Sequence, residues 1–355
     1  MSSCLDRGVS DEVGGVPLLA GQAAIDYTVL ALMVLGNSFI VASVCRYRRH
    51  YPVLGTAASA RFAANLALAD TYVGVATGYF LVFRYFCWAQ DVLGSRRFSC
   101  VLRFFLVSSA HMTSAYSLGA IALDRYVAVV HALQYRKIMN LRRSATLLIT
   151  VWVCPLATCS PLLYWNKWTD GIICEVEAVV PVEFVTAIGM LTHASIIITV
   201  TVIHYRVHRE AVAVKKRRRC DESQQVIFTV RCPDGNHLSA PRAINTKSAR
   251  IVLYVTGVYL FSWAPYTVLY IIKSCGYSSP EINVIYRLCF SFANINYLIN
   301  PFLYSWNNSA VRKSIISSLK CLGVLNKQKN DVGSRSSSSR ISSAVPSGPS
   351  VHCIR

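Results

Sequence analysis

Long apolar blocks determine what this chain can fold into. Each block has about 20 residues or more, which is enough to cross a hydrocarbon core about 30 Å thick. Lipid offers the backbone no hydrogen-bond partner, so each block must be a helix. Seven blocks span roughly residues 25–46, 58–86, 98–127, 144–165, 182–206, 248–273 and 281–305. The sequence therefore predicts an all-α membrane protein, a seven-transmembrane helix bundle.

Composition and charge exclude other classes. Only 15% of the residues are charged and 54% are hydrophobic, whereas a soluble domain has about 25% charged residues. The net charge of +19 would suit a nucleic-acid binder. However, the basic residues fall mainly in alternate loops, above all in residues 207–247, which is the pattern that orients a membrane protein. This asymmetry predicts an extracellular N-terminus (1–24) and a cytoplasmic C-terminus, with no nucleic-acid partner.

The segment after the last block has two parts. Residues 308–321 are basic and amphipathic, which predicts a short eighth helix on the inner leaflet. Cys321 ends it and is a candidate palmitoylation site; an unmodified surface thiol is the alternative. Residues 322–355 are rich in serine and lack an apolar period, so we expect a disordered cytoplasmic tail.

Three motifs stand in three different blocks. Charge at membrane depth is costly and tends to mark function. The motif residues are Asp124, Arg125 and Tyr126 in the third block, Trp263 and Pro265 in the sixth, and Asn300, Pro301 and Tyr304 in the seventh. Together and in this order, they resemble the signature set of rhodopsin-like (class A) G-protein-coupled receptors. The resemblance covers roughly residues 25–320.

The resemblance implies how such a receptor would switch at the plasma membrane. Arg125 would pair with Asp124 at rest, and would release it to meet a heterotrimeric G protein. Trp263, Pro265 and Tyr259 would form the hinge of the sixth helix, whose inner end swings outward. Tyr205 and Tyr304 would then approach each other through water.

Two further implications concern the inner side. Many relatives carry an acidic clamp at the inner end of the sixth helix, where this chain has Asn245. We therefore expect measurable basal activity. The serine-rich tail resembles the phosphorylated tail of a desensitising receptor, with receptor kinases and arrestin as partners beside the membrane lipids. A plain solvated tail is the alternative.

A carboxylate at mid-membrane, Asp70, requires polar partners. The resemblance supplies Asn37, Ser114, Trp263, Asn296 and Asn300, which in the family line a sodium site. Asp70 and Ser114 would be the sodium ligands, because carboxylate and hydroxyl oxygens suit a small hard cation. The alternative is a polar cluster that only holds helices together. Tyr297 stands where many relatives have a small polar residue and would crowd the site.

The resemblance also pairs two cysteines across the outer loops, Cys100 and Cys174. Cys4 and Cys275 are candidates for a second bridge, whose connectivity the sequence alone does not fix.

The ligand is approached by exclusion. Amine receptors have an aspartate at the position of Val107, and opsins have a retinal-binding lysine at the position of Asn294, so neither an amine ligand nor a retinal cofactor is expected. The candidate ligand contacts are Arg103, Val107, His111, His193, Tyr266, Tyr270, Tyr286 and Asn294. Arg103 with Arg84 would hold an anionic head group, or both would snorkel to the interface. A lipid, a small non-amine molecule and a peptide stay open.

Departures from the family pattern narrow the branch. Ile197 and Ala132 replace prolines found in most relatives, which resembles the group of melanocortin, lysophospholipid, cannabinoid and adenosine receptors. A ligand-independent receptor and a membrane transporter are the alternatives. The halves show no internal repeat, which disfavours a transporter. No nucleophile–base set or metal motif indicates an enzyme.

Overall fold

The computed structural model describes residues 15–50, 58–186, 194–195, 198–203, 205–210, 212–213, 246–277, 279–307 and 309–321. Residues 246–256 and 303–309 are described by their backbone alone. The predicted positions of Cys4, His193, Asn245 and the tail from residue 322 lie outside this set, as does the Tyr304 side chain.

Six long helices in the described part follow the predicted blocks. They are α2 (Gly15–His50), α4 (Ala58–Tyr85), α5 (Arg97–Val130), α7 (Leu141–Cys159), α10 (Thr246–Ser274) and α11 (Pro280–Asn307). The short helix α12 (Ser309–Cys321) follows α11 and matches the predicted eighth helix. The all-α architecture is confirmed.

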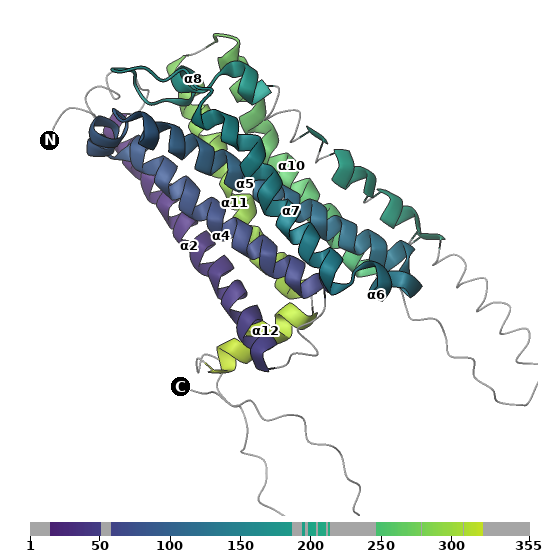
Figure 1. Cartoon of the computed structure of the whole chain (residues 1–355). Helices are drawn as coiled ribbons and strands as arrows, with labels where there is room; N and C mark the ends of the chain where they lie inside the picture. Colours follow the sequence, from purple (N-terminus) through teal and green to yellow (C-terminus); the bar gives the residue numbers. More distant parts are fainter. Residues whose placement is uncertain are drawn as a thin grey trace, which may run out of the picture.

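The long helices form one bundle (Figure 1). α4 lies between α2 and α5, α7 packs on α5, and α10 packs on α11. α12 crosses the lower end of α2 in this view and also contacts α11. We call this the α12 end of the bundle. The opposite end, which carries the short helix α8 (Val176–Val179), is called the disulfide end.

The first helix begins earlier than predicted. Residues 15–24, which the sequence assigned to the extracellular N-terminus, are the first turns of α2. This stretch carries no charge, and its Pro17 lies in the first turn, where a proline does not interrupt the helical hydrogen bonds. α2 therefore extends beyond the predicted span at that end.

The fifth block is helical wherever it is described. Helical residues occur at 182–186, 194–195, 198–203, 205–210 and 212–213. The helix therefore continues past residue 206, so the first part of the predicted 207–247 loop is helical.

The surface of the bundle suits lipid. By length and composition, three helices among the described residues could cross a membrane: Ala20–Arg49, Ala58–Tyr85 and Leu141–Leu163. Ile25, Leu32 and Leu35 on α2 are at least half exposed. Exposed apolar side chains on a continuous helix face are expected where lipid replaces water as the solvent.

Buried apolar side chains form three layers. The layer at the α12 end includes Phe62, Leu118 and Tyr259, and the layer at the disulfide end surrounds Cys100 and Cys174. The middle layer includes Met33, Val73, Phe290 and Tyr297. Trp263 packs against both the α12-end layer and the middle layer. A movement of Trp263 with α10 would therefore change the packing of both layers.

Candidate functional site

A charged pair closes the α12 end of α5. Arg125 Nε donates to Asp124 Oδ2 at 3.0 Å, and Arg125 Nη2 bonds the same oxygen. The Asp124 side chain is 1% exposed and that of Arg125 is 23% exposed. A carboxylate this buried needs a charged partner, so the pair constrains both side chains.

Tyr135 is a second partner of the buried carboxylate. It opens the short helix α6 (Tyr135–Ile138), and its hydroxyl donates to Asp124 Oδ1 at 2.6 Å. Burial, with the Asp124 charge beside it, raises the pKa of Tyr135, so the hydroxyl stays protonated and keeps donating. Both carboxylate oxygens are thus engaged, and the loop after α5 is tied to the pair. Sequence reasoning missed this role.

The other predicted switch residues are less engaged. The Tyr126 ring packs on His131 with centroids 5.9 Å apart. Tyr205 is 61% exposed, and the Arg209 guanidinium lies 5.9 Å from its ring centre. The predicted approach of Tyr205 to Tyr304 stays a prediction, because the Tyr304 side chain is outside the described residues.

Asp70 joins three helices at the centre of the bundle. It is fully buried on α4, with a relative exposure of 0%. Ser114 on α5 donates to its Oδ1 at 2.6 Å, and Asn300 Nδ2 on α11 donates to its Oδ2 at 2.9 Å. Asn37 Nδ2 on α2 bonds the Tyr297 carbonyl at 3.2 Å. The predicted polar residues are therefore brought together from four helices.

Three amide side chains of this polar core have oxygen atoms without a hydrogen-bond partner. The side-chain oxygens of Asn37, Asn296 and Asn300 are buried, and within the described part of the chain none has a hydrogen-bond partner. A buried polar atom left unpaired costs free energy, and an ion or water is one explanation for it. Amide oxygens beside a carboxylate are the donor set of a hard monovalent or divalent cation. The residues present therefore fit sodium. The fully buried Tyr297 stands among them, as the sequence predicted.

An aromatic column runs along α10 and α11 towards this core. Tyr286 stacks on Tyr266 with centroids 4.9 Å apart, and Tyr266 meets Trp263 edge-on at 5.6 Å. Trp263 in turn contacts Tyr297 at 6.5 Å and Tyr259 at 6.2 Å. We call these five rings the aromatic column.

His111 packs on the column from α5. Its ring stands edge-on to Trp263, with centroids 4.9 Å apart. Its Nδ1 lies 2.6 Å from the Val107 carbonyl oxygen. Pro265 lies inside α10, two residues after Trp263. Because proline removes a backbone donor, α10 has a weakened point there.

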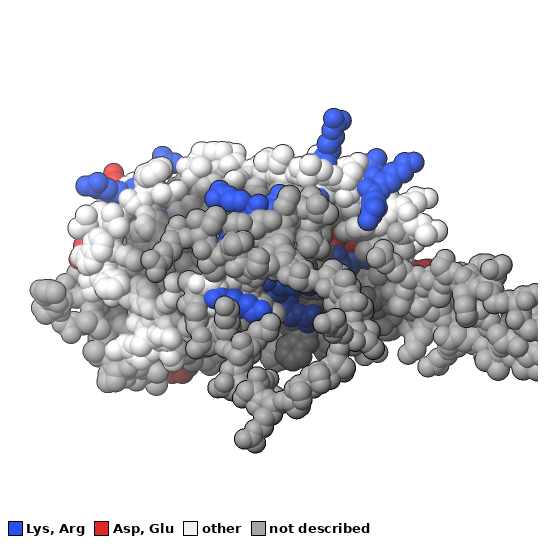
Figure 2. Space-filling model, turned by 90° about the horizontal axis from the view of Figure 1, so that it is seen from below, with Lys and Arg blue, Asp and Glu red and all other residues white. Residues whose placement is uncertain are grey.

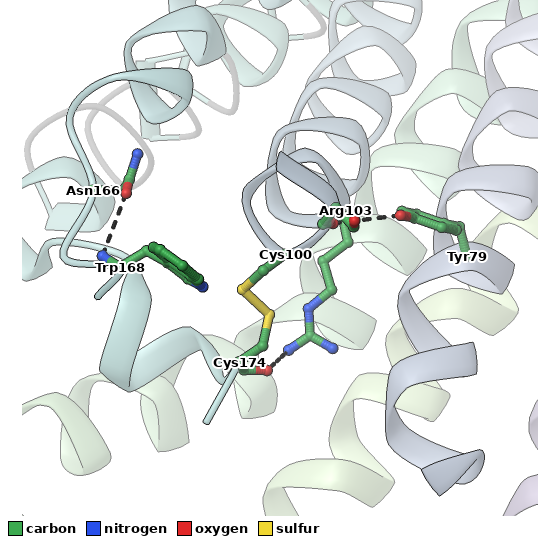
Figure 3. The surroundings of a disulfide bond; sticks show 7 residues. Tyr79, Cys100, Arg103, Asn166, Trp168 and Cys174 are labelled. Atoms are coloured by element: carbon green, nitrogen blue, oxygen red, sulfur yellow. Dashed lines mark hydrogen bonds between the residues drawn. A yellow bond between two sulfur atoms is a disulfide. The ribbon is translucent and has the colours of Figure 1, made fainter. Parts of the chain in front are cut away.

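A disulfide fastens the loop between α7 and the fifth helix to the start of α5. Cys100 and Cys174 are bonded, with Cα atoms 5.8 Å apart, as the family resemblance implied. Figure 3 shows Arg103 reaching from α5 to the Cys174 carbonyl oxygen, to which its Nη2 donates.

One of the two roles predicted for Arg103 is wrong. Its side chain is 5% exposed, so it does not snorkel. Its guanidinium carbon lies 5.1, 4.6 and 4.5 Å from the ring centres of Phe80, Phe83 and Phe104. Three aromatic faces and a carbonyl oxygen contact this cation, which holds the loop in place. Its Nε is buried without a hydrogen-bond partner among the described residues, so a contact with ligand stays a prediction.

An ion pair lies above the aromatic column. Lys273 Nζ at the end of α10 lies 2.6 Å from Glu177 Oε1 on α8, and 4.5 Å from the centre of the Tyr286 ring. Below it, the hydroxyl groups of Tyr266 and Tyr286 are 2.8 Å apart. Sequence reasoning did not single out Lys273 or Glu177, because neither belongs to a motif.

Three remaining predicted residues are placed as follows. Tyr270 is buried. Asn294 Nδ2 donates to the Phe290 carbonyl at 2.8 Å. Cys275 is exposed and forms no disulfide with a residue that the structure describes; because Cys4 lies outside those residues, the second bridge stays a prediction.

Cys321 ends α12 beside α2. Its sulfur lies 2.8 Å from Arg46 Nη2 and takes part in a disulfide bond. Acylation of this residue would first require a reduced thiol. Palmitoylation therefore stays a prediction.

A family profile described as "7 transmembrane receptor (rhodopsin family)" matches residues 36–304 of this chain. The chain belongs to this family. The matched range contains the charged pair, the polar core and all five rings of the aromatic column.

The individual relatives have low sequence identity to this receptor, and their names describe different kinds of receptor. Melanopsin of Felis catus is 28% identical over 82% of this chain and 59% of its own length. The alpha-1A adrenergic receptor of Homo sapiens is 24% identical, covering 84% of this chain and 67% of its own. The pyroglutamylated RF-amide peptide receptor of Rattus norvegicus is 23% identical, with coverage of 82% and 68%. The receptor thus spans less than two thirds of the melanopsin chain.

These relatives leave the branch of the receptor unconfirmed. None of the three belongs to the melanocortin, lysophospholipid, cannabinoid and adenosine group that Ile197 and Ala132 indicate. That placement stays a prediction.

Proposed function

We propose that the receptor lies in the plasma membrane with its disulfide end outside, binds an extracellular ligand there, and activates heterotrimeric G proteins at its α12 end. The observation that carries this proposal is the Asp124–Arg125 pair with Tyr135 bound to the same carboxylate. It is a charged contact, partly open to solvent, at the α12 end of the bundle.

Basic side chains support the proposed orientation. Figure 2, which views the molecule from below, shows Lys and Arg at several places on the described surface and little acidic surface. Positive residues accumulate on the cytoplasmic side of membrane proteins. The same charge suits anionic lipid head groups beside α12.

Activation would be a shift between two packings of the same helices. A ligand at the disulfide end would displace Tyr266 or Tyr286, and the aromatic column would pass that change to Trp263. α10 would bend at Pro265 and its α12 end would swing outward. Arg125 would then leave Asp124 and contact the G protein.

Sodium is proposed as a regulator of this shift. Asp70 and Ser114 would hold the ion, with the unpartnered oxygens of Asn37, Asn296 and Asn300 nearby. A bound cation would supply positive charge beside Asp70 and favour the packing in which these oxygens converge. Rearrangement of α11 would disperse them.

The proposed ligand is neither an amine nor retinal. Val107 offers no carboxylate to an ammonium group, and its carbonyl oxygen is already in contact with His111. Asn294 offers no amine for a Schiff base and bonds its own helix. The names of the adrenergic and melanopsin relatives are therefore not carried over as ligand assignments.

Regulation at the tail completes the proposal. The serine-rich segment after α12 would be phosphorylated by receptor kinases and then recognised by arrestin. Acylation of reduced Cys321 would anchor α12 to the inner leaflet. Asn245, in place of an acidic clamp, supports appreciable signalling without ligand.

The test compares G-protein activation by the receptor and by Arg125→Ala at matched surface expression. Cyclic AMP and dissociation sensors for the four Gα families would be read in the same cells. A basal signal that Arg125→Ala abolishes, while Arg97→Ala at the other end of α5 retains it, is the expected result. Equal signals from all three chains and empty vector, in every sensor, would overturn the proposed coupling.

A further inference from the structure

Three basic residues lie where α12 crosses the end of α2 (Figure 1). Arg46 and Arg49 belong to the last turn of the membrane-spanning part of α2, which ends at Arg49. Arg46 Nη2 donates to Cys321 Sγ at 2.8 Å, and Lys320 precedes that cysteine on α12. We call Arg46, Arg49 and Lys320 the basic corner. It brings positive charge from two helices to one edge of the bundle.

No acid of either helix neutralises the basic corner. α12 contains no acidic residue, and the one acid of α2, Asp26, lies about 30 Å from Arg46 along the helix at 1.5 Å per residue. Arg46, Arg49 and Lys320 are exposed, and none of them forms an ion pair with another residue that the structure describes. A group with several negative charges would therefore be attracted by all three cations at once.

An exposed apolar row on α2 leads to the basic corner. Leu32, Leu35 and Ala42 are exposed. Arg46 and Arg49 continue the same row, because the steps of three, seven, four and three residues keep these positions on one face of a helix. From Leu35 to Arg46 the row rises about 16 Å, which is about half of the hydrocarbon core of about 30 Å. An acyl chain of one leaflet lying along this row would thus place its head group at the basic corner.

α12 presents a surface of the same kind. Val311 and Ser314 are buried against the bundle, whereas Lys313, Ile316 and Lys320 are exposed on another face. An apolar side chain between lysines on an amphipathic helix is typical of a helix lying at a membrane surface. The basic corner is therefore bordered by lipid-facing surface on both helices, which favours a lipid over a soluble anion as its partner.

We propose that the basic corner binds the head group of a polyphosphorylated inositol phospholipid. Arg46 and Arg49 donate to the phosphate groups from α2, and Lys320 adds the third positive charge from α12. A phosphate monoester carries about −1.5 to −2 charges at neutral pH, so two of them match three cations better than the single net charge of phosphatidylserine does. One acyl chain lies along the exposed row of α2.

This site deepens the proposed function and rests on the orientation proposed there, because anionic phospholipids accumulate in the cytoplasmic leaflet. A head group shared by the two helices would hold α12 against α2. α12 follows α11, whose Asn300 bonds Asp70 on α4. The lipid would therefore stabilise the packing in which these helices are joined, and this stabilisation can be measured.

The experiment follows the thermal midpoint of the full-length receptor in detergent against probe concentration, since a ligand that binds only the folded state raises it. The probes are dioctanoyl phosphatidylinositol bisphosphate, dioctanoyl phosphatidylserine and free inositol trisphosphate. The variant Arg49→Gln/Lys320→Gln removes two charges of the basic corner and leaves the contact of Arg46 with Cys321 in place. The matched control, Arg136→Gln/Lys137→Gln, removes an exposed arginine and an exposed lysine from α6 at the same end of the bundle.

We expect the bisphosphate lipid to act at about one tenth of the concentration that phosphatidylserine needs. Each Lys or Arg near an anionic surface strengthens binding about fivefold, so Arg49→Gln/Lys320→Gln should raise the required concentration of the bisphosphate lipid about 25-fold. The α6 control should change it less than about threefold, because those charges lie outside the site. Arg49→Lys/Lys320→Arg keeps both charges and should retain most of the affinity. Inositol trisphosphate lacks acyl chains and should need about ten times more than the lipid.

Four outcomes would overturn the proposal. The two lipids act at equal concentration; Arg49→Gln/Lys320→Gln leaves the response to the bisphosphate lipid unchanged; the α6 control loses as much as this variant, which would indicate attraction by total charge alone; or the free head group is as effective as the lipid, which would assign the corner to a soluble phosphate. Should the double variant not fold, Arg49→Gln alone should show about a fivefold loss. The assay needs no G protein, so failure of coupling and failure of this site are distinguished.

Discussion

Replacing Asp124 by asparagine should raise basal signalling. The substitution keeps the size of the side chain and leaves an oxygen to accept the Tyr135 hydroxyl, which now lies 2.6 Å from Asp124 Oδ1. It removes the negative charge that faces Arg125. The perturbation therefore weakens one contact of the resting packing and leaves the neighbouring contact in place.

The magnitude follows from the exposure of the two partners. A hydrogen bond to a charged group contributes about 1.5–3 kcal/mol. The Arg125 side chain is 23% exposed, so solvent screens part of its attraction to Asp124. We therefore assign about 1–2 kcal/mol to the interaction that the substitution removes. Since about 1.4 kcal/mol is a tenfold change in an equilibrium constant, the ratio of active to resting receptor should rise about 5- to 30-fold. A receptor that is about 1% active would become roughly 5–25% active.

The assay is basal dissociation of G-protein sensors at equal surface expression, with no ligand added. Asp91→Asn is the matched control, because Asp91 is an exposed acid at the other end of the bundle. The double variant with Arg125→Ala should return to the background, because the released arginine is what would contact the G protein. Basal activity of Asp124→Asn that equals both the receptor and Asp91→Asn would refute the assignment of the pair as a lock.

Three further predictions concern other parts of the receptor. Arg103→Met should lower the thermal midpoint in detergent, by about 2 kcal/mol of stability, because it loses the Cys174 carbonyl and three aromatic faces; a midpoint equal to that of Arg97→Met would contradict this. Cys174→Ser should cost about 2–5 kcal/mol and reduce surface expression, since it opens a bridge between residues 74 apart; unchanged expression measured by surface antibody labelling would argue against it. Asp70→Asn should abolish any rise of the thermal midpoint on replacing potassium by sodium, because the carboxylate is the only charged ligand proposed; a sodium response that persists would place the ion elsewhere.

The long helices were predictable because their cause is local. A run of about 20 apolar residues must be helical in lipid whatever surrounds it. The start of α2 at Gly15 could not be predicted, because the stretch before residue 25 carries no charge that would mark where the membrane-spanning part of the helix begins. The Cys100–Cys174 bridge came from family resemblance, because spacing alone leaves the pairing of cysteines open.

Side-chain contacts between different helices were harder to predict from the sequence than the helices themselves. That Asp70 needs polar partners could be anticipated because it is a carboxylate inside an apolar block, whereas Ser114 and Asn300 as those partners came from the family resemblance. Tyr135 was missed because a tyrosine in a polar loop is ordinary, and only the folded loop brings it to Asp124. The burial of Arg103 could not be predicted because the rotation of α5, which turns this residue towards three phenylalanines, is a property of the packed bundle.

The aromatic column has a consequence for how large an agonist must be. Each ring is a rigid plate that turns about only two bonds, and each touches the next, from Tyr286 through Tyr266 and Trp263 to Tyr297. A movement of the Tyr286 ring must be passed to the next ring, because packed interiors hold few voids into which a ring could move instead. A compound that contacts only Tyr286 can therefore change the packing near Asp70 without touching it. Potency in this receptor should follow how firmly a compound tilts Tyr286, and not how deeply it enters.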